Sequence, residues 1–332
     1  MRNFWEGKRV LVTGGAGFIG SALVWKLNQQ GCADIVIADV PPNAKKQRNL
    51  DPLRFESYVE ARDLRSMLDA STLGDFACVF HLGACSSTTE TNEEYLRTNN
   101  YEYTRGLAEW AIQKGVRFVY ASSAATYGDG SSGMDDLDPR QIERLKPLNP
   151  YGRSKQEFDL HAYKNGWLDQ IVGLKYFNVY GPNEYHKGNM CSLIYKSFGQ
   201  IIESGEISLF KSYKPEYADG EQVRDFLYVK DAVAMTLHLA ETHSAAGIFN
   251  VGSGAAHSWN ELAGYIFAAL GKNARIRYVE MPEAIRAHYQ YFTQANIVKL
   301  LKTGYSAPIL PLREAVHEYV VNYLLPDRVL DP

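Results

Sequence analysis

The sequence predicts an α/β protein, a doubly wound parallel sheet of the Rossmann type with a smaller α+β lobe for a substrate. Two observations lead to this fold class. An apolar run at residues 9–13 is followed at once by a glycine-rich segment at 14–20 and then by apolar residues at helical spacing. Short apolar runs then alternate with helical patterns as far as residue 178, the order expected of a parallel sheet with crossover helices.

The first element is a strand, turn and helix built around Gly14, Gly17 and Gly20. Glycines at such positions allow a tight turn and let the backbone approach a pyrophosphate closely. The helix that follows presents unpaired N–H groups and the positive end of its dipole to negative charge. The glycine spacing alone is a weak signal, but here strand, glycines and helix occur together. We therefore expect a dinucleotide site at this turn.

The second strand, residues 34–39, ends in Asp39. This carboxylate lies about 20 residues beyond the glycines, where such folds bond a ribose hydroxyl, and it favours NAD. Lys45, Lys46 and Arg48 follow closely and could hold a 2′-phosphate, which favours NADP. The alternative is that these three basic side chains form only a solvated loop.

The third and fourth strands are expected at residues 57–61 and 78–84. Asp63, just after the third, either contacts an adenine or caps the helix that begins at residue 64. The fourth strand runs into a polar loop at residues 85–90. Ligands bind at this carboxyl edge of an open α/β sheet.

A helix is predicted from Asn99 to about residue 114, and a fifth strand over residues 117–121. That strand opens into a Ser- and Ala-rich loop that contains Ser123. Residues 129–146 are rich in Asp, Gly and Ser and indicate a surface excursion.

Tyr151 and Lys155 are four residues apart and share one face of a predicted helix. A nearby ammonium lowers the pKa of a phenol, so Tyr151 could act as acid or base at neutral pH. Ser123 can hydrogen-bond the same oxygen centre. A Tyr-x-x-x-Lys pair alone is usually a surface pair, but here it follows the glycine loop and the Ser-Ser-Ala loop.

The remainder of the chain must supply the substrate lobe. Helices are expected at residues 190–203, 259–270 and 312–325, while 224–227 and 247–252 are expected to return to the main sheet. The predicted division is a cofactor domain of residues 1–182 with a return at about 224–256, and a substrate lobe of residues 183–223 and 257–332.

Composition sets bounds on function. The 332 residues are 45% hydrophobic and 22% charged, with a net charge of −3, so nothing favours a nucleic-acid surface. No apolar run resembles a signal peptide or a membrane span. Four scattered cysteines indicate reduced thiols and a cytoplasmic protein, and neither they nor the eight histidines form a metal-ligand pattern.

These motifs together resemble the extended short-chain dehydrogenases/reductases. The resemblance rests on Thr13-Gly14-x-x-Gly17-x-x-Gly20, on Ser123-Ala124 and on Tyr151-x-x-x-Lys155. Residues 224–231 and 249–252 also resemble later segments of that family. The resemblance implies the Rossmann sheet and smaller lobe already predicted, and a homo-oligomer.

A closer resemblance is to the ADP-L-glycero-D-manno-heptose 6-epimerases. It is carried by residues 81–90, 121–128, 176–182, His186-Lys187-Gly188 and the segment from Tyr289 to 295. The resemblance implies an epimerase that holds NADP and inverts C6 of an ADP-heptose, with Lys187 as a second proton donor. The further cofactor contacts that it implies are Phe18, Ile19, Asp39, Leu82, Gly83, Ala84, Cys85, Ser86, Asn99, Lys155, Val179 and Lys187. The candidate substrate contacts are Ser123, Asn178, Asn189, Lys196, Phe210, Arg224 and Tyr289.

Some positions depart from the family pattern or admit a plainer interpretation. Asn189 and Lys196 stand where the family often has Ser and His, and the loop at residues 212–222 is longer than usual. Arg224 could simply pair with a neighbouring Asp, although a sugar-nucleotide enzyme needs a cation for its diphosphate. Tyr289 lies in an aromatic run of the kind that usually packs in a core. Cys85 has no evident His partner and is expected to be an inert filler, and Lys187 could serve only as a charge for phosphate.

Two other functions compete with the epimerase of ADP-heptose. One is a 4-epimerase or dehydratase of a UDP- or GDP-hexose, but a dehydratase normally needs an acidic pair beside Ser123, and residues 124–126 offer none. The other is a non-catalytic dinucleotide sensor of the same fold, which would not need to retain both Tyr151 and Lys155.

Overall fold

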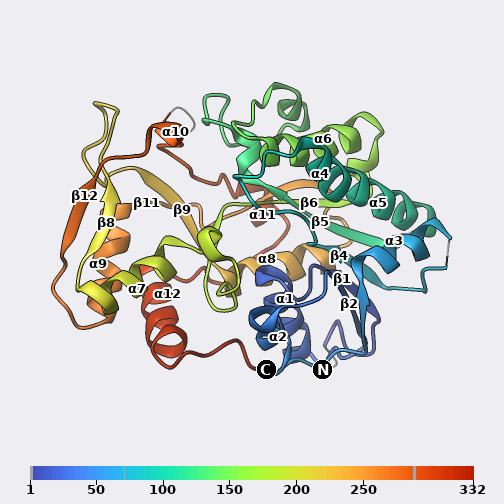
Figure 1. Ribbon diagram of the computed structural model, residues 1–332. Helices are drawn as coiled ribbons and strands as arrows, with labels where there is room; N and C mark the ends of the chain where they lie inside the picture. The colour runs from blue at the N-terminus through green and yellow to red at the C-terminus, as the bar shows by residue number, and fades with distance from the viewer. Residues whose placement is uncertain (1–2, 71, 287–288) are drawn as a thin grey trace.

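A computed structural model describes residues 3–70, 72–286 and 289–332, and Figure 1 shows its two parts. The larger is built on a seven-stranded sheet with the strand order β10-β6-β5-β4-β1-β2-β3, every pair of neighbours running parallel. The strands are β1 (Val10–Thr13), β2 (Ile35–Asp39), β3 (Ser57–Glu60), β4 (Cys78–His81), β5 (Arg117–Ser123), β6 (Val172–Tyr176) and β10 (Gly247–Val251). The predicted fold class is confirmed.

Alternate residues of the central strands face two separate hydrophobic cores. Val10 and Val12 of β1 pack with helices α1 and α8, whereas Leu11 packs on the other face with α3, α5 and α6. Both faces are therefore covered, which is why these strands are continuous apolar runs rather than alternating ones. The helices are α1 (Phe18–Gln29), α2 (Ala44–Leu50), α3 (Ala61–Asp69), α5 (Tyr103–Lys114), α6 (Pro150–Lys164) and α8 (Val229–Glu241).

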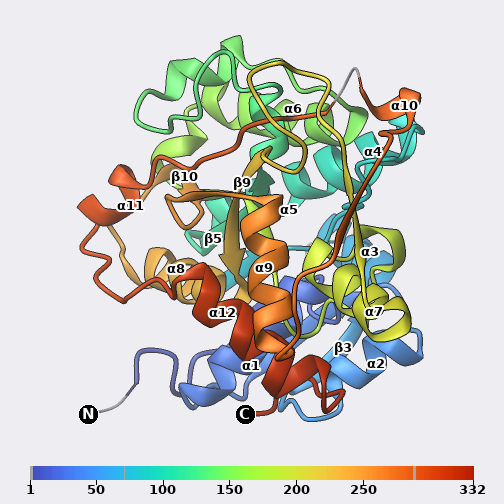
Figure 2. The ribbon, with the colours of Figure 1, turned by 90° about the vertical axis from the view of Figure 1, so that its left-hand side faces the viewer.

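The smaller part carries a three-stranded sheet, β11-β9-β7, and a two-stranded sheet, β12-β8. In Figure 2, α9 lies beside α12, and the two helices are in contact. A capping box of Ser258 and Glu261 starts α9, and Ser192 caps α7. The elements are β7 (Asn178–Tyr180), α7 (Leu193–Ser204), β8 (Ile207–Phe210), β9 (Val223–Tyr228), β11 (Ala256–Ser258), α9 (Trp259–Ala269), β12 (Ile276–Val279), α10 (Glu283–Arg286) and α12 (Leu312–Tyr319), while α11 (Val298–Lys302) lies against β10 of the main sheet.

One predicted strand joins a different sheet from the one expected. The segment at 247–252 returns to the main sheet as β10, but the segment at 224–227 does not. Strands β5 and β10 flank β6, and β9 pairs with the short strand β7, which leaves the main sheet. Because β9 carries Arg224, this pairing places that residue in the smaller part.

Several element boundaries, and the excursion at 129–146, also differ from the prediction. The helix expected from Asn99 begins earlier, at α4 (Glu93–Leu96), and passes through a π-helical turn over Arg97–Glu102 before α5. The last helix keeps α-helical form only to Tyr319 and ends in a second π-helical segment. The excursion at 129–146 contains the short helix Pro139–Arg144 and buries Ile142, so it packs onto the protein. Among the described residues, no helix is long and apolar enough to cross a membrane.

Candidate functional site

The glycine turn after β1 forms a cradle that only glycine can line. Gly14 has a φ of 71°, and a Cβ there would lie 2.7 Å from the backbone nitrogen of Gly83. A Cβ on Gly20 would overlap the carbonyl oxygen of Gly14. Gly17 caps α1 without any side-chain bond, so the first N–H groups of this 12-residue helix stay open to an anion. These residues fit the pyrophosphate of a dinucleotide.

Asp39 is held against this cradle at the end of β2. Its carboxylate accepts hydrogen bonds from the backbone nitrogens of Ala16, at 3.1 Å, and Val40, at 2.7 Å. The ammonium of Lys46 pairs with the same carboxylate at 3.1 Å. The carboxylate predicted to meet a ribose thus lies beside a cation that can meet a phosphate.

The other basic side chains near Asp39 are directed elsewhere. Lys45 is exposed, and the guanidinium of Arg48 pairs with Asp327 at 2.9 Å, close to the end of the chain. Helix α2 is capped by Asn43, and its phase directs Lys46 toward Asp39. Of the three candidates for a phosphate, Lys46 is the one already in place.

Asp63 is not the N-cap of the helix that follows β3. Helix α3 begins two residues earlier, with Glu60 at its N-cap, so the alternative that Asp63 caps the helix is wrong. Asp63 sits exposed in the first turn and pairs with Arg62 at 3.3 Å. No contact with the glycine turn is found for it among the described residues.

The loop after β4 is hydrogen-bonded to Thr13, before the glycine turn, and to Asn100, which was not among the predicted site residues. The hydroxyl of Thr13 accepts a hydrogen bond from the Gly83 nitrogen at 3.0 Å. Asn100 accepts from the nitrogen of Cys85 at 2.8 Å and donates to its carbonyl oxygen at 3.0 Å. The predicted contact Asn99 instead accepts from Arg65 and donates to the backbone. Residues Leu82, Gly83, Ala84 and Cys85 are half-buried and Ser86 is exposed.

Tyr151 and Lys155 occupy one face of α6, with Ser123 at the adjoining end of β5. Asn149 caps this helix through the nitrogen of Gly152 at 2.7 Å, with Pro150 at its first position. Burial raises the pKa of Tyr151, and a hydrogen bond from Ser123 to its phenol oxygen lowers it. The tyrosine and serine are therefore brought together as predicted.

Lys155 does not act on Tyr151 as expected. Its ammonium donates to the carbonyl oxygen of Ala121 at 2.8 Å, and burial lowers the pKa of Lys155 to about 8. The net effect on the Tyr151 pKa is upward, contrary to the predicted fall. The expectation considered the charge of Lys155 alone, whereas the loss of solvent around the phenol is the larger effect.

Lys187 reaches the glycine turn from the segment after β7. Its ammonium lies 5.3 Å from the centre of the Phe18 ring at the start of α1. Burial lowers its pKa, while the carboxylate of Glu184 raises it. Asn189, nearby in sequence, accepts a hydrogen bond at its carbonyl oxygen from Lys196 at 2.6 Å. Both of these substrate candidates are exposed.

Arg224 is buried between two aromatic rings and has no acidic partner among the described residues. Its guanidinium lies 5.5 Å from the ring of Trp259 and 5.2 Å from that of Tyr289, and it donates to the carbonyl oxygens of Val223 and Gln290. The plainer interpretation, pairing with a neighbouring Asp, is wrong: Asp225 accepts instead from residues 253, 254 and 295.

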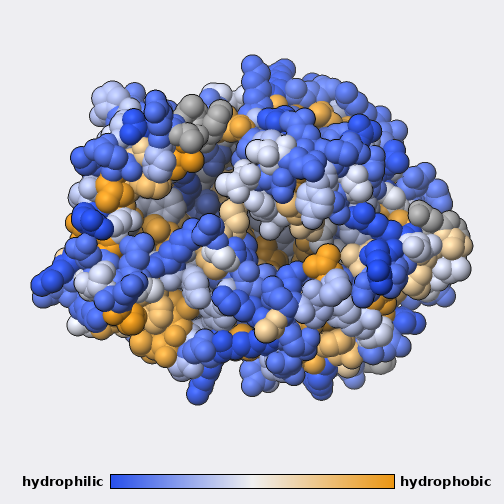
Figure 3. Space-filling view, in the orientation of Figure 1, coloured by the Kyte–Doolittle hydropathy of each residue, from blue (hydrophilic) through white to orange (hydrophobic). Residues whose placement is uncertain are grey.

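Trp259 is the member of this group that sequence reasoning missed. Its indole N–H donates to the hydroxyl of Tyr289 at 2.9 Å, and Phe210 packs edge-on against Tyr289 at 6.4 Å. Asn178 is exposed on β7 and accepts from Thr293 at 3.3 Å, and Val179 beside it is half-buried. The face drawn in Figure 3 is hollowed between the smaller part and the main sheet domain.

The arrangement could hold a dinucleotide at the glycine turn, and Tyr151 and Lys187 are its candidate proton carriers. Among the described residues, no group of His, Cys, Asp and Glu could hold a metal ion. Cys85 lies near Tyr151 and Lys155. A negative charge at Cys85 raises the pKa of both side chains.

Comparisons with known proteins agree with this geometry. A family model described as the NAD dependent epimerase/dehydratase family matches residues 10–252. The chain is 49% identical over 315 residues to an ADP-L-glycero-D-manno-heptose-6-epimerase of Nitratidesulfovibrio vulgaris, covering 95% of this chain and 97% of that protein. The solved ADP-L-glycero-D-manno-heptose-6-epimerase of Helicobacter pylori matches with a TM-score of 0.78 and 27% identity, over 97% of this chain and 98% of the other. A UDP-glucuronic acid 4-epimerase of Bacillus cereus, solved in complex with NAD, matches with a TM-score of 0.74 and 27% identity, over 95% and 99%.

Proposed function

Because the chain belongs to the NAD dependent epimerase/dehydratase family, and within it to the ADP-L-glycero-D-manno-heptose-6-epimerases, we propose that it converts ADP-D-glycero-D-manno-heptose into its L-glycero epimer. The observation that carries the proposal is the presence of two titratable side chains on different elements. Tyr151 of α6 meets Ser123 at the end of β5, and Lys187, after β7, lies against Phe18 at the glycine turn. A sugar oxygen that moves between two places needs two such groups.

The cofactor that we propose is NADP, with NAD as the alternative. Lys46 supports NADP because its ammonium already lies at Asp39, where the 2′ position of the ribose is expected. The Asp39 carboxylate supports NAD for the same reason, and the related 4-epimerase was solved with NAD. Charge-assisted contacts to a phosphate are among the stronger hydrogen bonds, so Lys46 favours NADP.

A nicotinamide dinucleotide held at the glycine turn and by Asp39 would supply the hydride chemistry, namely removal of a hydride from C6 of the heptose and its return to the opposite face. Tyr151 holds the proton of the C6 hydroxyl in one orientation of the substrate, assisted by Ser123. C6 is exocyclic, so rotation about C5–C6 exposes its other face and moves its oxygen away from Tyr151. One proton donor cannot serve both positions at about 3 Å, and Lys187 serves the second. Lys155 binds the nicotinamide ribose.

Arg224 binds the diphosphate of the substrate in this proposal. Its guanidinium keeps donors free after the two backbone contacts, and the rings of Trp259 and Tyr289 fix its plane. Asn178, Asn189, Lys196 and Phe210 complete the proposed substrate contacts. We also propose that the protein acts in the cytoplasm as a homo-oligomer, which light scattering on the purified protein tests.

A panel of nucleotide sugars tests the function. The purified protein is incubated with ADP-, UDP- and GDP-linked sugars without added cofactor, and the products are analysed for epimers. We expect inversion at C6 of the ADP-heptose alone. Turnover of only a UDP-hexose would favour the 4-epimerase, and binding of dinucleotide without turnover of any sugar would favour the non-catalytic sensor.

A further inference from the structure

A buried ion pair lies beneath the proposed catalytic residues and is used by none of them directly. Asp159 and Lys175 are 0% and 2% exposed, and their carboxylate oxygen and ammonium nitrogen are 2.7 Å apart. Asp159 follows Tyr151 and Lys155 at two steps of four residues on α6, so the three side chains share one face of the helix. Lys175 comes from β6, on the other side of β5.

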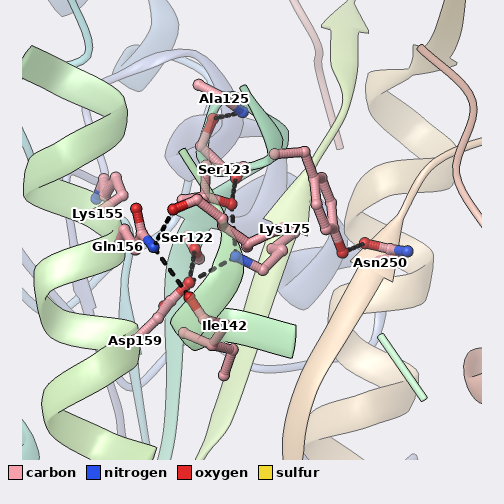
Figure 4. A network of polar contacts seen from close by, with 12 residues as sticks. Ser122, Ser123, Ala125, Ile142, Lys155, Gln156, Asp159, Lys175 and Asn250 are labelled. Carbon is pink, nitrogen blue, oxygen red and sulfur yellow. Dashed lines mark hydrogen bonds and ion pairs between the residues drawn. The ribbon is translucent and has the colours of Figure 1, made fainter. Parts of the chain in front are cut away.

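The carboxylate of Asp159 ties α6 to the strand that carries Ser123. It accepts hydrogen bonds from the hydroxyl of Tyr120 at 2.9 Å and from that of Ser122 at 2.7 Å, both on β5. Figure 4 shows Ser122 and Lys175 pointing at this carboxylate from the strands, with α6 opposite. Charged groups that bind three donors in a dry site define one geometry, because any displacement leaves a charge unpaired.

The ammonium of Lys175 continues the network to the loop of Ser123. It donates to the hydroxyl of Thr126 at 2.6 Å, which in turn donates to the carbonyl oxygen of Ser123 at 2.8 Å. The hydroxyl of Ser123 also accepts from the nitrogen of Ala125 at 3.1 Å. The network therefore holds both ends of the proposed Tyr151–Ser123 contact, one through α6 and one through this loop.

We propose that Asp159 and Lys175 are positioning residues that hold Ser123 and Tyr151 together beside the ammonium of Lys155. The proposal rests on the roles given above to Tyr151, Ser123 and Lys155. Asp159 supplies the negative charge next along the helix from Lys155, and Lys175 fixes the Asp159 carboxylate between α6 and the strands.

The charges around Lys155 support this role. Burial lowers its pKa to about 8, while Asp159 and the thiol of Cys85 raise it. His81 of β4 is buried and neutral, since its own pKa is lowered by burial and by Lys155, so it brings no charge. Of the groups that face Lys155, Asp159 favours the ammonium most strongly.

The test measures the ionisation of Lys155 without relying on turnover. The NMR signal of its Cε carbon is assigned by its loss in Lys155→Arg and is followed against pH in the full-length protein. Asp159→Asn leaves the positive Lys175 alone and should lower the Lys155 pKa by roughly one unit. Lys175→Met leaves the negative Asp159 alone and should raise it. The double variant has no unpaired charge and should lie between Asp159→Asn and the parent.

One control variant and two possible outcomes show whether the proposal is wrong. Glu157→Gln removes an exposed carboxylate from the same helix and should leave the titration unchanged. If the single variants fail to fold, the double variant still decides, because a Lys155 titration equal to that of the parent would overturn the proposal. Shifts of the two single variants in the same direction would also overturn it.

The rate of epimerisation gives a second readout. The alkaline limb of the kcat/KM profile should move with the Lys155 pKa in each variant, which a loss of stability alone would not cause. If the parent turns over no sugar while the Lys155 titration still follows the expected order, the proposed function falls and the positioning role of the pair remains.

Discussion

At the scale of single residues, Tyr151 and Lys187 are the two proposed proton donors, one for each position of the C6 oxygen. Tyr151→Phe and Lys187→Met should each lower net epimerisation by on the order of 10² or more, with little effect on substrate binding. Each variant should still oxidise or reduce one stereochemical form of an aldehyde analogue, and the two variants should prefer opposite forms. Glu157→Gln, on the exposed side of α6, serves as the control for the helix.

This prediction separates a proton donor from a phosphate ligand at Lys187. Its ammonium lies near Phe18 at the glycine turn, so contact with a cofactor phosphate is the competing explanation. Initial rates and product stereochemistry decide between them. A Lys187→Met variant that epimerises at the parent rate, or that fails only through a raised KM, contradicts the two-donor scheme.

The basic residues after β2 give a prediction about cofactor choice. Lys46→Ala should weaken the binding of NADP by about 1.5–3 kcal/mol, because one charge-assisted contact is lost, and should leave NAD binding nearly unchanged. Lys45→Ala should have a smaller effect because Lys45 is exposed. Arg48→Ala is the matched control, since its guanidinium is engaged with Asp327. Isothermal titration with both dinucleotides measures the differences. An equal loss for both would show that Lys46 does not contact the 2′-phosphate.

The sequence identified small groups of candidate binding residues but could not show which member of each group makes the contact. Lys45, Lys46 and Arg48 fit the charge pattern equally, and only the phase of α2 directs Lys46 to Asp39. Asn99 and Asn100 stand side by side, and the π-helical turn decides that Asn100 holds the Cys85 loop. Both choices depend on backbone geometry that residue types do not encode.

At the scale of elements, local patterns predicted the strands and helices well and their partners less well. The apolar runs that became β1, β2 and β4 are short and buried throughout, so their length and composition identified them. No separate strand was predicted at β6. Strand β9 was assigned to the wrong sheet, because its apolar pattern fits any sheet and its partners, β7 and β11, are set by contacts between segments distant in the sequence.

The excursion at 129–146 supplies a prediction about stability. Asp136 is 6% exposed, accepts a hydrogen bond from the nitrogen of Asn250 at 2.6 Å, and has a second oxygen with no partner. Burial raises its pKa to about 6. A carboxyl whose pKa is raised on folding destabilises the folded state as pH rises from its unfolded value, near 4, through 6.

Asp136→Asn should therefore stabilise the protein at neutral pH. The amide oxygen can still accept from Asn250, and the cost of a buried charge, of the order of 2 kcal/mol, disappears. The gain in the free energy of unfolding should be present at pH 8 and should shrink as pH falls from 6 to 4, measured by urea denaturation. Asp138→Asn is the control, since Asp138 is exposed and paired with Arg140. A gain that does not change with pH would show that the Asp136 carboxylate is not the cause.

At the scale of the whole molecule, the fold class and the family followed from motifs near the glycine turn and α6. The proposed substrate site did not, because it joins β7, β9 and the start of α9 with the segment from Tyr289, which are far apart in the sequence. The aromatic run at Tyr289 was expected to be core packing or a substrate contact, and Trp259 was not considered. The predicted division into two lobes stays a prediction, with β9 now assigned to the sheet of the smaller part.

Substitution of Arg224, whose guanidinium lies between Trp259 and Tyr289, tests whether the smaller part recognises the substrate. Arg224 has no acidic partner among the described residues, so the proposed diphosphate is the anion that would offset its buried charge. Arg224→Lys keeps the charge but loses the planar fork and the stacking, and should weaken ADP-sugar binding by about 1.5–3 kcal/mol.

Dinucleotide binding should be unchanged in Arg224→Lys, because the cofactor cradle lies at the main sheet and β9 does not belong to that sheet. Titration of the variant with ADP-sugar and with NADP measures the two affinities separately. Trp259→Phe is the matched partner variant, since it keeps a ring beside Arg224 but removes the hydrogen bond to Tyr289, and should have a smaller effect. If Arg224→Lys lost both ligands equally, the guanidinium would serve the fold of the whole protein, and substrate recognition would have to lie elsewhere.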